Sequence, residues 1–326
     1  MMHQVQQTRR FNVLFALSTI TIMLFYLSLS QLFSLFGDSE AIKVSTLTSQ
    51  RWRPTASSSG DGKISSNVAA IIDNRPLDRL MPLLLHFSSI LGPGWPIVLF
   101  TSSKNDIPMS APLRRLIDER RIEVRLLADV DFNNRLDVSR FMTEPWIWEQ
   151  LSPAGHVLIF QADSILCSNS ALRVDDFLGY DFIGAPIDLA YGEGYNGGLS
   201  LRNRSMVLEI IHESNWSNEF DLADDKDKPC VEFEDQWFYK KMKELADRGR
   251  QAARLPSLEV AKTFSVESIW HDEPLGYHQV QRWQSGRMDE VERWCPEYKI
   301  ATSDVISSTG HSKLPGQDVY IQEKKN

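Results

Sequence analysis

A buried strand that ends in a polar loop is the feature of this sequence that most constrains its fold. The run from Val157 to Phe160 is entirely apolar and contains β-branched and aromatic residues, which is typical of a buried strand. Gln161, Asp163 and Ser164 follow closely behind it. Ligands of open α/β sheets bind beyond the carboxyl ends of the strands, so these three side chains are candidates for a binding site.

The segments around this strand predict an α/β fold. Apolar runs at 67–73, 96–100 and 122–127 predict further strands, and the segments between them carry apolar residues at helical spacing. Strands that alternate with helices favour a mostly parallel sheet with helices on both faces, a Rossmann-type arrangement. Further along the chain, the pattern at 261–267 predicts another strand and that at 274–278 predicts a turn.

A glycine-rich segment follows the central strand. Residues 192–198 contain four glycines, and an apolar alternation resumes after them. Glycines at this density allow the backbone to approach a ligand closely. We therefore expect this segment to line a binding site.

Three residues carry groups suited to metal or acid–base chemistry, and each also has an ordinary structural explanation. Asp163 either caps a turn or holds a divalent ion that neutralises a diphosphate. Asp235 precedes an expected helix at 237–249, where it either meets the helix dipole or takes a proton from a hydroxyl nucleophile. His278 is either a structural histidine or a metal ligand. Spacing alone leaves both interpretations open for each residue.

The amino-terminal region predicts a membrane anchor. Residues 11–36 contain no charged side chain, and at ~1.5 Å per residue they are long enough to cross a ~30 Å hydrocarbon core. Arg9 and Arg10 precede them, which places residues 1–10 in the cytosol. A cleaved signal peptide is the competing interpretation, but its apolar region would be shorter. We expect a single-pass type II protein of the Golgi or endoplasmic reticulum membrane, with its main domain in the lumen.

The remaining boundaries follow from composition. Residues 37–65 are rich in serine and threonine and predict a flexible stem, residues 66–300 form the expected globular domain, and residues 301–326 form a polar tail. A net charge of −8 excludes nucleic acid as the main partner, because phosphate binding needs a basic face.

Cysteines and glycosylation sequons add two expectations. Cys167, Cys230 and Cys295 allow at most one disulfide, and their spacing does not fit a zinc site. The pairing stays open. Asn203 and Asn215 each begin a sequon, and Asn215 is the expected glycosylation site because Asn203 lies close to the central stretch.

Five blocks of the sequence, taken together, resemble a known family. The blocks are residues 160–167, 181–186, 194–202, 234–238 and 274–278. They are similar to fungal membrane-anchored proteins of a domain family long labelled as of unknown function, within the GT-A glycosyltransferase superfamily. The resemblance covers residues 66–285.

The resemblance implies a function and a set of roles. It implies a GT-A-like, hexosyltransferase-like enzyme that moves a sugar from a nucleotide-sugar to a hydroxyl of a glycan, protein or cell-wall precursor. Asp163 and His278 would hold a divalent metal ion, expected to be Mn²⁺, and Asp235 would be the general base of an inverting reaction. The implied donor-binding residues are Gln161, Asp163, Ser164, Asn196, Gly197, Gly198 and Arg75.

One departure from the family pattern leaves alternatives open. Gln161 stands where the motif usually has an acid, so one carboxylate is missing and metal dependence is not fixed by the sequence. A transferase-like protein that binds a glycan or a partner without turnover is one alternative. A glycoside hydrolase with Asp163 and Asp235 as its paired carboxylates is another.

Overall fold

The structure is a computed structural model that describes residues 64, 66–102, 105, 107–127, 130, 132, 134–224 and 231–302. Outside these residues lie the predicted segments 1–10 and 11–36, nearly all of the predicted stem 37–65, and residues 303–326 of the predicted tail. Within the described part, no helix combines the length and the apolar composition that crossing a membrane requires.

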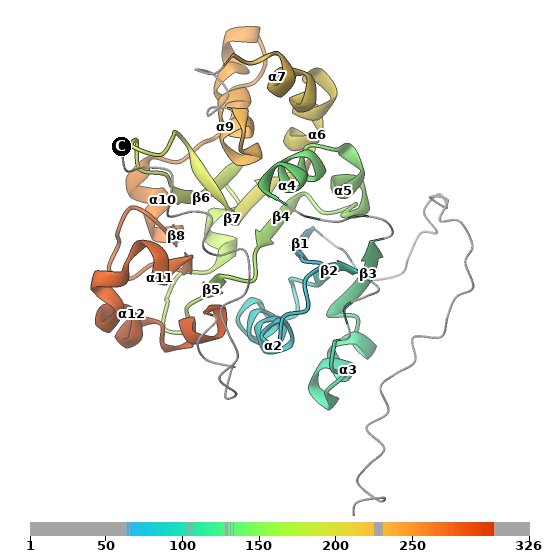
Figure 1. Ribbon diagram of the computed structural model, residues 1–326, viewed down its shortest axis with the longest axis vertical. Coiled ribbons are helices and arrows are strands. Elements are labelled where there is room, and N and C mark those ends of the chain that lie inside the picture. Colours follow the sequence, from blue (N-terminus) through green and yellow to red (C-terminus); the bar gives the residue numbers. More distant parts are fainter. Residues whose placement is uncertain are drawn as a thin grey trace, which may run out of the picture. The chain divides into compact units, whose positions relative to one another are not determined.

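A six-stranded mixed sheet forms the centre of the domain, with strand order β3-β2-β1-β4-β7-β6 (Figure 1). Its strands are β1 (Asn67–Ile72), β2 (Ile97–Ser102), β3 (Ile122–Leu127), β4 (His156–Phe160), β6 (Phe182–Pro186) and β7 (Tyr195–Asn203). The four strands from β3 to β4 run parallel, whereas β7 is antiparallel to both β4 and β6. The mostly parallel sheet expected from the sequence is therefore confirmed.

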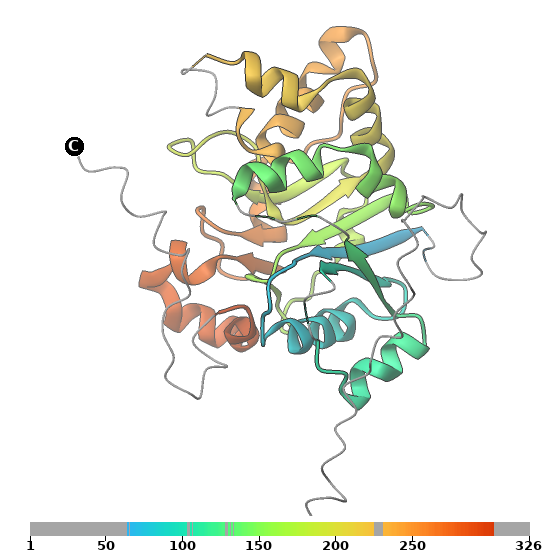
Figure 2. The same ribbon diagram turned by 45° about the vertical axis from the view of Figure 1, so that its right-hand side comes forward.

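Helices cover both faces of this sheet. The pair α2 (Leu80–Leu91) and α3 (Ala111–Asp118) lies on one face, and the pair α4 (Arg135–Met142) and α5 (Pro145–Gln150) lies on the other (Figure 2). The other helices are α6 (Arg204–Glu213), α7 (Trp216–Leu222), α9 (Glu234–Glu244), α10 (Leu258–Phe264), α11 (Val280–Trp283) and α12 (Met288–Trp294). Short 3₁₀ helices are η1 (Val174–Phe177), η2 (Ala246–Arg248), η3 (Ser285–Arg287) and η4 (Pro296–Ala301).

A second sheet of three short strands has the order β5-β9-β8. Its strands are β5 (Ser164–Leu166), β8 (Ser265–Val266) and β9 (Gly276–His278). The expected strand at 261–267 is wrong for most of its length, because α10 extends to Phe264. The Ser257 side chain caps that helix, and Ala261 and Phe264, which are three positions apart, are buried. The expected turn at 274–278 is also wrong at its end, which is strand β9.

The core fixes the strand end that leads into the candidate site. Leu83, Leu84 and Phe87 of α2 are fully buried, and the Phe87 ring stacks on Phe160 with centroids 3.9 Å apart. Fully burying one such side chain contributes about 1.5–3 kcal/mol. Phe160 is the last residue of β4, so the position of Gln161 just after it is set by a well-packed core.

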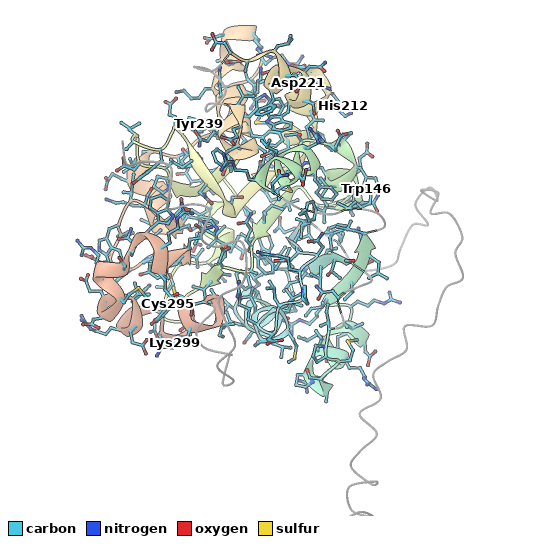
Figure 3. The ribbon with its side chains drawn as sticks, in the orientation of Figure 1. Trp146, His212, Asp221, Tyr239, Cys295 and Lys299 are labelled. Carbon is cyan, nitrogen blue, oxygen red and sulfur yellow. A yellow bond between two sulfur atoms is a disulfide. The ribbon has the colours of Figure 1, made fainter. Side chains whose placement is uncertain are left out.

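One disulfide connects the small sheet to the C-terminal helices. Cys167, just after β5, is bonded to Cys295, just after α12 and labelled in Figure 3. The sequence left the pairing open, and the structure shows it to be Cys167 with Cys295. Cys230 lies outside the described residues. The bond closes a loop with a sequence separation of 128 residues and holds β5, which directly follows Asp163, against the C-terminal region.

Candidate active site

The small sheet brings Asp163 and His278 together. Ser164 of β5 pairs with His278 of β9, and the Gln279 N–H donates to the Asp163 carbonyl at 3.0 Å, which extends the ladder by one residue. His278 Nε2 consequently lies 3.4 Å from Asp163 Oδ1. Gln279 adopts a left-handed conformation with φ of 47° as the chain turns from β9 into α11.

Both ring nitrogens of His278 face oxygen acceptors. Nε2 lies 3.1 Å from the amide oxygen of Gln161, and Nδ1 lies 3.1 Å from Glu267 Oε1. Burial opposes a charged ring, but Asp163 and Glu267 outweigh it and raise the pKa of His278 to about 10. Burial likewise opposes ionisation of Asp163, but the charge and hydrogen bond of His278 outweigh it and hold the pKa of Asp163 well below its usual range.

Glu267 is a site residue that the sequence analysis missed. Its carboxylate is buried, and its contact with Nδ1 fixes the orientation of the His278 ring, so that Nε2 points toward Asp163. The residue lies within the segment that was expected to be a strand, and no spacing relates it to His278. A buried acid close to a candidate histidine was the only signal available.

The side chains around Asp163 supply some of the ligands that a divalent ion requires. Within the described part of the chain, no three His, Cys, Asp or Glu side chains come together to hold a metal. Asp163 and His278 do meet, and the neutral oxygen of Gln161 joins them. One carboxylate, one imidazole and one amide oxygen fit an ion such as Mn²⁺ that takes its other ligands from phosphate oxygens and water.

Two arginines that follow β1 lie near this cluster. Arg75 pairs with the buried Asp73, with Nη2 2.7 Å from Oδ2, and Arg79 Nε donates to the Ala162 carbonyl at 3.1 Å. The charge of Asp163 acts on the pKa of both arginines. Burial is the largest effect on Arg79 and lowers its pKa. Among the described residues, the terminal nitrogens of Arg79 have no hydrogen-bond or ion-pair partner.

Arg75 was predicted from the sequence as a donor-binding residue, whereas Arg79 was not. Arg79 is the residue that precedes α2, so it lies at a helix start beyond the carboxyl end of β1. Its position after the first strand of an α/β sheet was a usable signal, because anions bind at helix starts of this kind.

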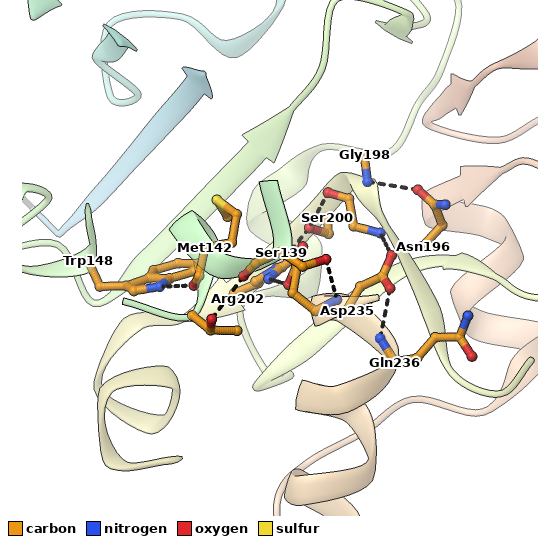
Figure 4. Close-up of polar contacts among 12 residues, drawn as sticks. Ser139, Met142, Trp148, Asn196, Gly198, Ser200, Arg202, Asp235 and Gln236 are labelled. Carbon is orange, nitrogen blue, oxygen red and sulfur yellow. Dashed lines mark hydrogen bonds and ion pairs between the residues drawn. The ribbon is translucent and has the colours of Figure 1, made fainter. Parts of the chain in front are cut away.

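The pairing of β7 with β6 is interrupted at the end of the glycine-rich segment. Gly184 of β6 pairs with Ser200, but the next residue, Ala185, pairs with Asn196, so residues 197–199 have no counterpart on β6. The Asn196 side chain accepts a hydrogen bond of 2.7 Å from the Gly198 N–H and closes a local turn (Figure 4). Bulges of this kind redirect a strand locally, and here the bulge turns two glycines toward different parts of the site.

Gly198 contacts the Asp163–His278 cluster. Its carbonyl accepts hydrogen bonds from the Gln161 N–H at 2.8 Å and from the Ser164 hydroxyl at 2.7 Å. A Cβ at this position would overlap the His278 ring, so only glycine fits without a shift. Ser164 is fully buried, so its hydroxyl holds the Gly198 carbonyl from the interior of the protein.

Gly197 contacts Asp235. The Gly197 N–H donates to Asp235 Oδ2 at 2.7 Å, and the Gln236 N–H donates to Oδ1 at 2.7 Å (Figure 4). Burial raises the pKa of Asp235 to about 7, and the charge of Glu234 adds to this effect, while Arg202 and the two backbone hydrogen bonds oppose it. The helix begins at Glu234 instead of at 237, so Asp235 lies inside the first turn.

Glu234, the neighbouring acid, forms a buried ion pair. Its two oxygens accept hydrogen bonds of 2.6 and 2.9 Å from Arg202, which is completely buried among aromatic rings. A Cβ at Gly197 would overlap both members of the pair. The pair therefore joins β7 to the start of α9 and holds Asp235 beside the glycine segment.

Replacing Gly198 by alanine is expected to abolish nucleotide-dependent stabilisation of the protein. The added methyl group would displace His278 from Asp163, and a misplacement of about 1 Å can cost about 10²-fold in a positioned site. The check is thermal unfolding of the purified chain with and without nucleoside diphosphate and Mn²⁺. Gly179→Ala is the matched control, because a Cβ there meets no atom within 4 Å. A Gly198→Ala variant that responds like the wild type would contradict this geometry.

The two sequon asparagines differ in their surroundings. Asn215 is exposed, and its side-chain oxygen accepts a hydrogen bond from the Asn218 N–H at the start of α7. The amide nitrogen of Asn203 instead donates to Asp181 at 2.8 Å. Asn215 thus stays the predicted glycosylation site, with an amide nitrogen that faces no partner within the described residues.

A family model matches a region that contains most of the candidate residues, although Arg75 and Arg79 lie before it. The chain matches a family described as "Protein of unknown function (DUF5672)" over residues 121–278, slightly less than half of its length. This region contains Asp163, the glycine-rich segment and Asp235, and it ends at His278. None of the curated proteins matches the chain.

Two solved structures are similar to the chain at low sequence identity. The apo-form of the glycosyltransferase GlyE from Streptococcus pneumoniae TIGR4 has a TM-score of 0.41 and 13% identity, over 67% of this chain and 55% of that chain. Another GlyE structure from the same organism has a TM-score of 0.35 and 14% identity, over 66% and 54%. The chain thus spans about half the length of these proteins.

Proposed function

We propose that this protein is a glycosyltransferase with a GT-A-like fold that moves a sugar from a nucleotide-sugar to a hydroxyl acceptor. The observation that carries the proposal is the arrangement around two adjacent glycines. Gly198 contacts His278 beside Asp163, and Gly197 binds Asp235. Groups suited to binding a diphosphate therefore lie on one side of this short segment, and a carboxylate suited to deprotonating a hydroxyl lies on the other. A displacement at a sugar carbon requires both.

The donor diphosphate is proposed to bind beside Asp163. The unpartnered guanidinium nitrogens of Arg79 suit phosphate oxygens, which arginine binds in pairs, and Arg75 adds a second positive charge nearby. A divalent ion, proposed to be Mn²⁺, would be held by Asp163, His278 and Gln161, and when bound it would neutralise the charge that develops on the diphosphate. His278 would hold the ion through Nε2 only in its neutral form, so its ring would have to give up a proton.

Asp235 is proposed to be the general base. The acceptor oxygen attacks the anomeric carbon while the bond from that carbon to the diphosphate oxygen breaks. The hydroxyl proton passes to Asp235, and the nucleoside diphosphate leaves with the electron pair, with inversion at the sugar carbon. A pKa of about 7 suits this role, because the carboxylate is then available near neutral pH and still accepts a proton readily. Asn196 and the two glycines are proposed to line the donor sugar.

The protein is further proposed to lie in the membrane of the endoplasmic reticulum or Golgi, with its catalytic domain in the lumen. The uncharged segment 11–36 supports an anchor. The bond between Cys167 and Cys295 supports an oxidising compartment, where disulfides persist.

Two observations favour turnover over binding alone. Gln161 in place of an acid motivates the alternative of a non-catalytic binding protein. A buried carboxyl whose pKa lies near neutrality and a half-buried guanidinium whose terminal nitrogens have no partner among the described residues are both costly in a protein that only binds, and both are useful in a transferase.

The test of the donor site is thermal unfolding of the purified full-length chain with UDP or GDP, with and without Mn²⁺. A nucleotide at ~100 times its Kd is expected to add ~2.7 kcal/mol to the free energy of unfolding. Asp163→Ala should remove the part that depends on Mn²⁺, and Arg79→Ala should weaken binding in both conditions. Arg114→Ala, on the exposed side of α3, is the matched control. The donor site would be refuted if neither nucleotide stabilised the wild type.

A further inference from the structure

The loop between β6 and β7 holds an exposed aromatic side chain beside the candidate active site. Tyr191 is 59% exposed, and Leu189 is 85% exposed. The loop is fixed at both ends, because the Asp188 N–H donates to the Ser268 hydroxyl at 3.0 Å and the Glu193 N–H donates to the Gln236 side chain at 3.3 Å. Tyr191 is therefore presented by an anchored loop.

The anchors connect this loop to Asp235. Gln236 is the residue after Asp235, and its side chain packs so closely on Gly192 that a Cβ there would overlap it. Gly194 packs in the same way on Tyr239 of α9, which is labelled in Figure 3. The loop thus lies against the helix turn that carries the proposed base.

Tyr191 also reaches the element that follows His278. Its ring contacts that of Trp283 edge to face, with centroids 4.8 Å apart and an interplanar angle of 68°. Trp283 ends α11, which begins two residues after His278. The aromatic pair therefore connects the loop beside the helix that carries the base to α11, the element that follows the proposed metal ligand.

We propose that Tyr191 and Trp283 form a subsite that holds a pyranose ring of the acceptor. This inference rests on the proposed glycosyltransferase function and names the acceptor as a glycan. The C–H face of a pyranose is apolar and slightly positive, and it packs on the electron-rich face of an aromatic ring. A rigid aromatic side chain loses little conformational entropy on binding and so suits this task.

The surroundings favour a sugar over a lipid chain. Glu193 and Lys243 form an exposed ion pair of 2.7 Å next to the loop, and the Arg282 guanidinium lies 4.8 Å from the Trp283 ring centroid. These polar groups suit sugar hydroxyls. A lipid chain needs a continuous apolar surface, but the other exposed large apolar side chains of the described residues belong to β3, α7 and α10, namely Val124, Leu126, Leu222 and Leu258.

The experiment compares acceptor use and saccharide binding in the full-length chain. The probes are the methyl α- and β-pyranosides of glucose, galactose and mannose. Tyr191→Ala is expected to raise the KM for the saccharide that is used about three- to tenfold, with the KM for donor and the release of nucleoside diphosphate to water unchanged. Tyr191→Phe keeps the ring and should stay within twofold of the wild type. Leu222→Ala is the control for loss of an exposed apolar side chain.

Saccharide binding is read independently by saturation-transfer NMR, which requires no turnover. If the donor is never consumed but the wild type binds a pyranoside and Tyr191→Ala does not, the subsite stands while the glycosyltransferase proposal fails. Equal pyranoside binding by the wild type and Tyr191→Ala would overturn the subsite. Displacement of the pyranoside by farnesyl phosphate, with no pyranoside-dependent turnover, would overturn it in favour of a lipid acceptor.

Discussion

Replacing Asp235 by asparagine is expected to reduce sugar transfer by about 10²–10⁴-fold, the range that a positioned general base contributes. The amide cannot accept the acceptor proton, although it keeps the size of the carboxyl. The measurement is kcat at saturating donor. Asp221→Asn, on the exposed side of α7 (Figure 3), is the matched control and should leave kcat unchanged. Turnover by Asp235→Asn at the wild-type rate would remove Asp235 from the mechanism.

The pKa of Asp235 gives this prediction a second readout. Only the ionised carboxylate accepts a proton, so kcat/KM should rise tenfold per pH unit below about 7 and level off above it. The same carboxyl contributes stability that is fully present below its unfolded pKa, near 4, and is lost as the pH rises through about 7. A pH profile already flat from pH 5 upward would contradict the raised pKa.

Replacing Arg202 by methionine is expected to lower the free energy of unfolding by about 3–5 kcal/mol, because Glu234 would be left buried without its partner. The measurement is urea unfolding. Adding Glu234→Gln to Arg202→Met removes the unpaired charge and should restore part of the loss. Arg248→Met breaks an exposed ion pair with Glu244 and should cost about 1 kcal/mol or less.

Loss of Arg202 should also change the pKa of the proposed base, Asp235. The charge of Arg202 lowers the pKa of Asp235, so Arg202→Met should move the acid limb of the pH profile to higher pH in protein that remains folded. Equal stability losses for Arg202→Met and Arg248→Met would show that the buried pair does not hold β7 to α9.

The sequence predicted the four parallel strands of the main sheet and the position of Asp163 because both depend on local pattern. A short apolar run such as the one before Gln161 usually forms a buried strand. The carboxyl end of a strand in an α/β sheet is a common position for a binding site, regardless of the segments around it. The glycine-rich segment was predictable for the same reason, since its composition alone indicates close approach of the backbone.

The partners of the site residues could not be predicted, because they depend on how segments far apart in the sequence pair with each other. Asp163 meets His278 through the pairing of β5 with β9, whose members lie more than a hundred residues apart. Glu267 joins the same site through a contact that no sequence spacing reveals. The neighbours Glu234 and Asp235 look equivalent in the sequence. Only the hydrogen bonds from the buried Arg202 show that Glu234 forms an ion pair and leaves Asp235 as the candidate base.

The most direct test of the central claim is release of nucleoside diphosphate from a panel of nucleotide-sugars by the purified full-length chain in the presence of Mn²⁺. We expect release from one donor, strongly reduced in Asp163→Ala and retained in Asp221→Asn. Release from no donor, or equal release by the wild type and Asp163→Ala, would contradict the assignment of this site as a glycosyltransferase centre.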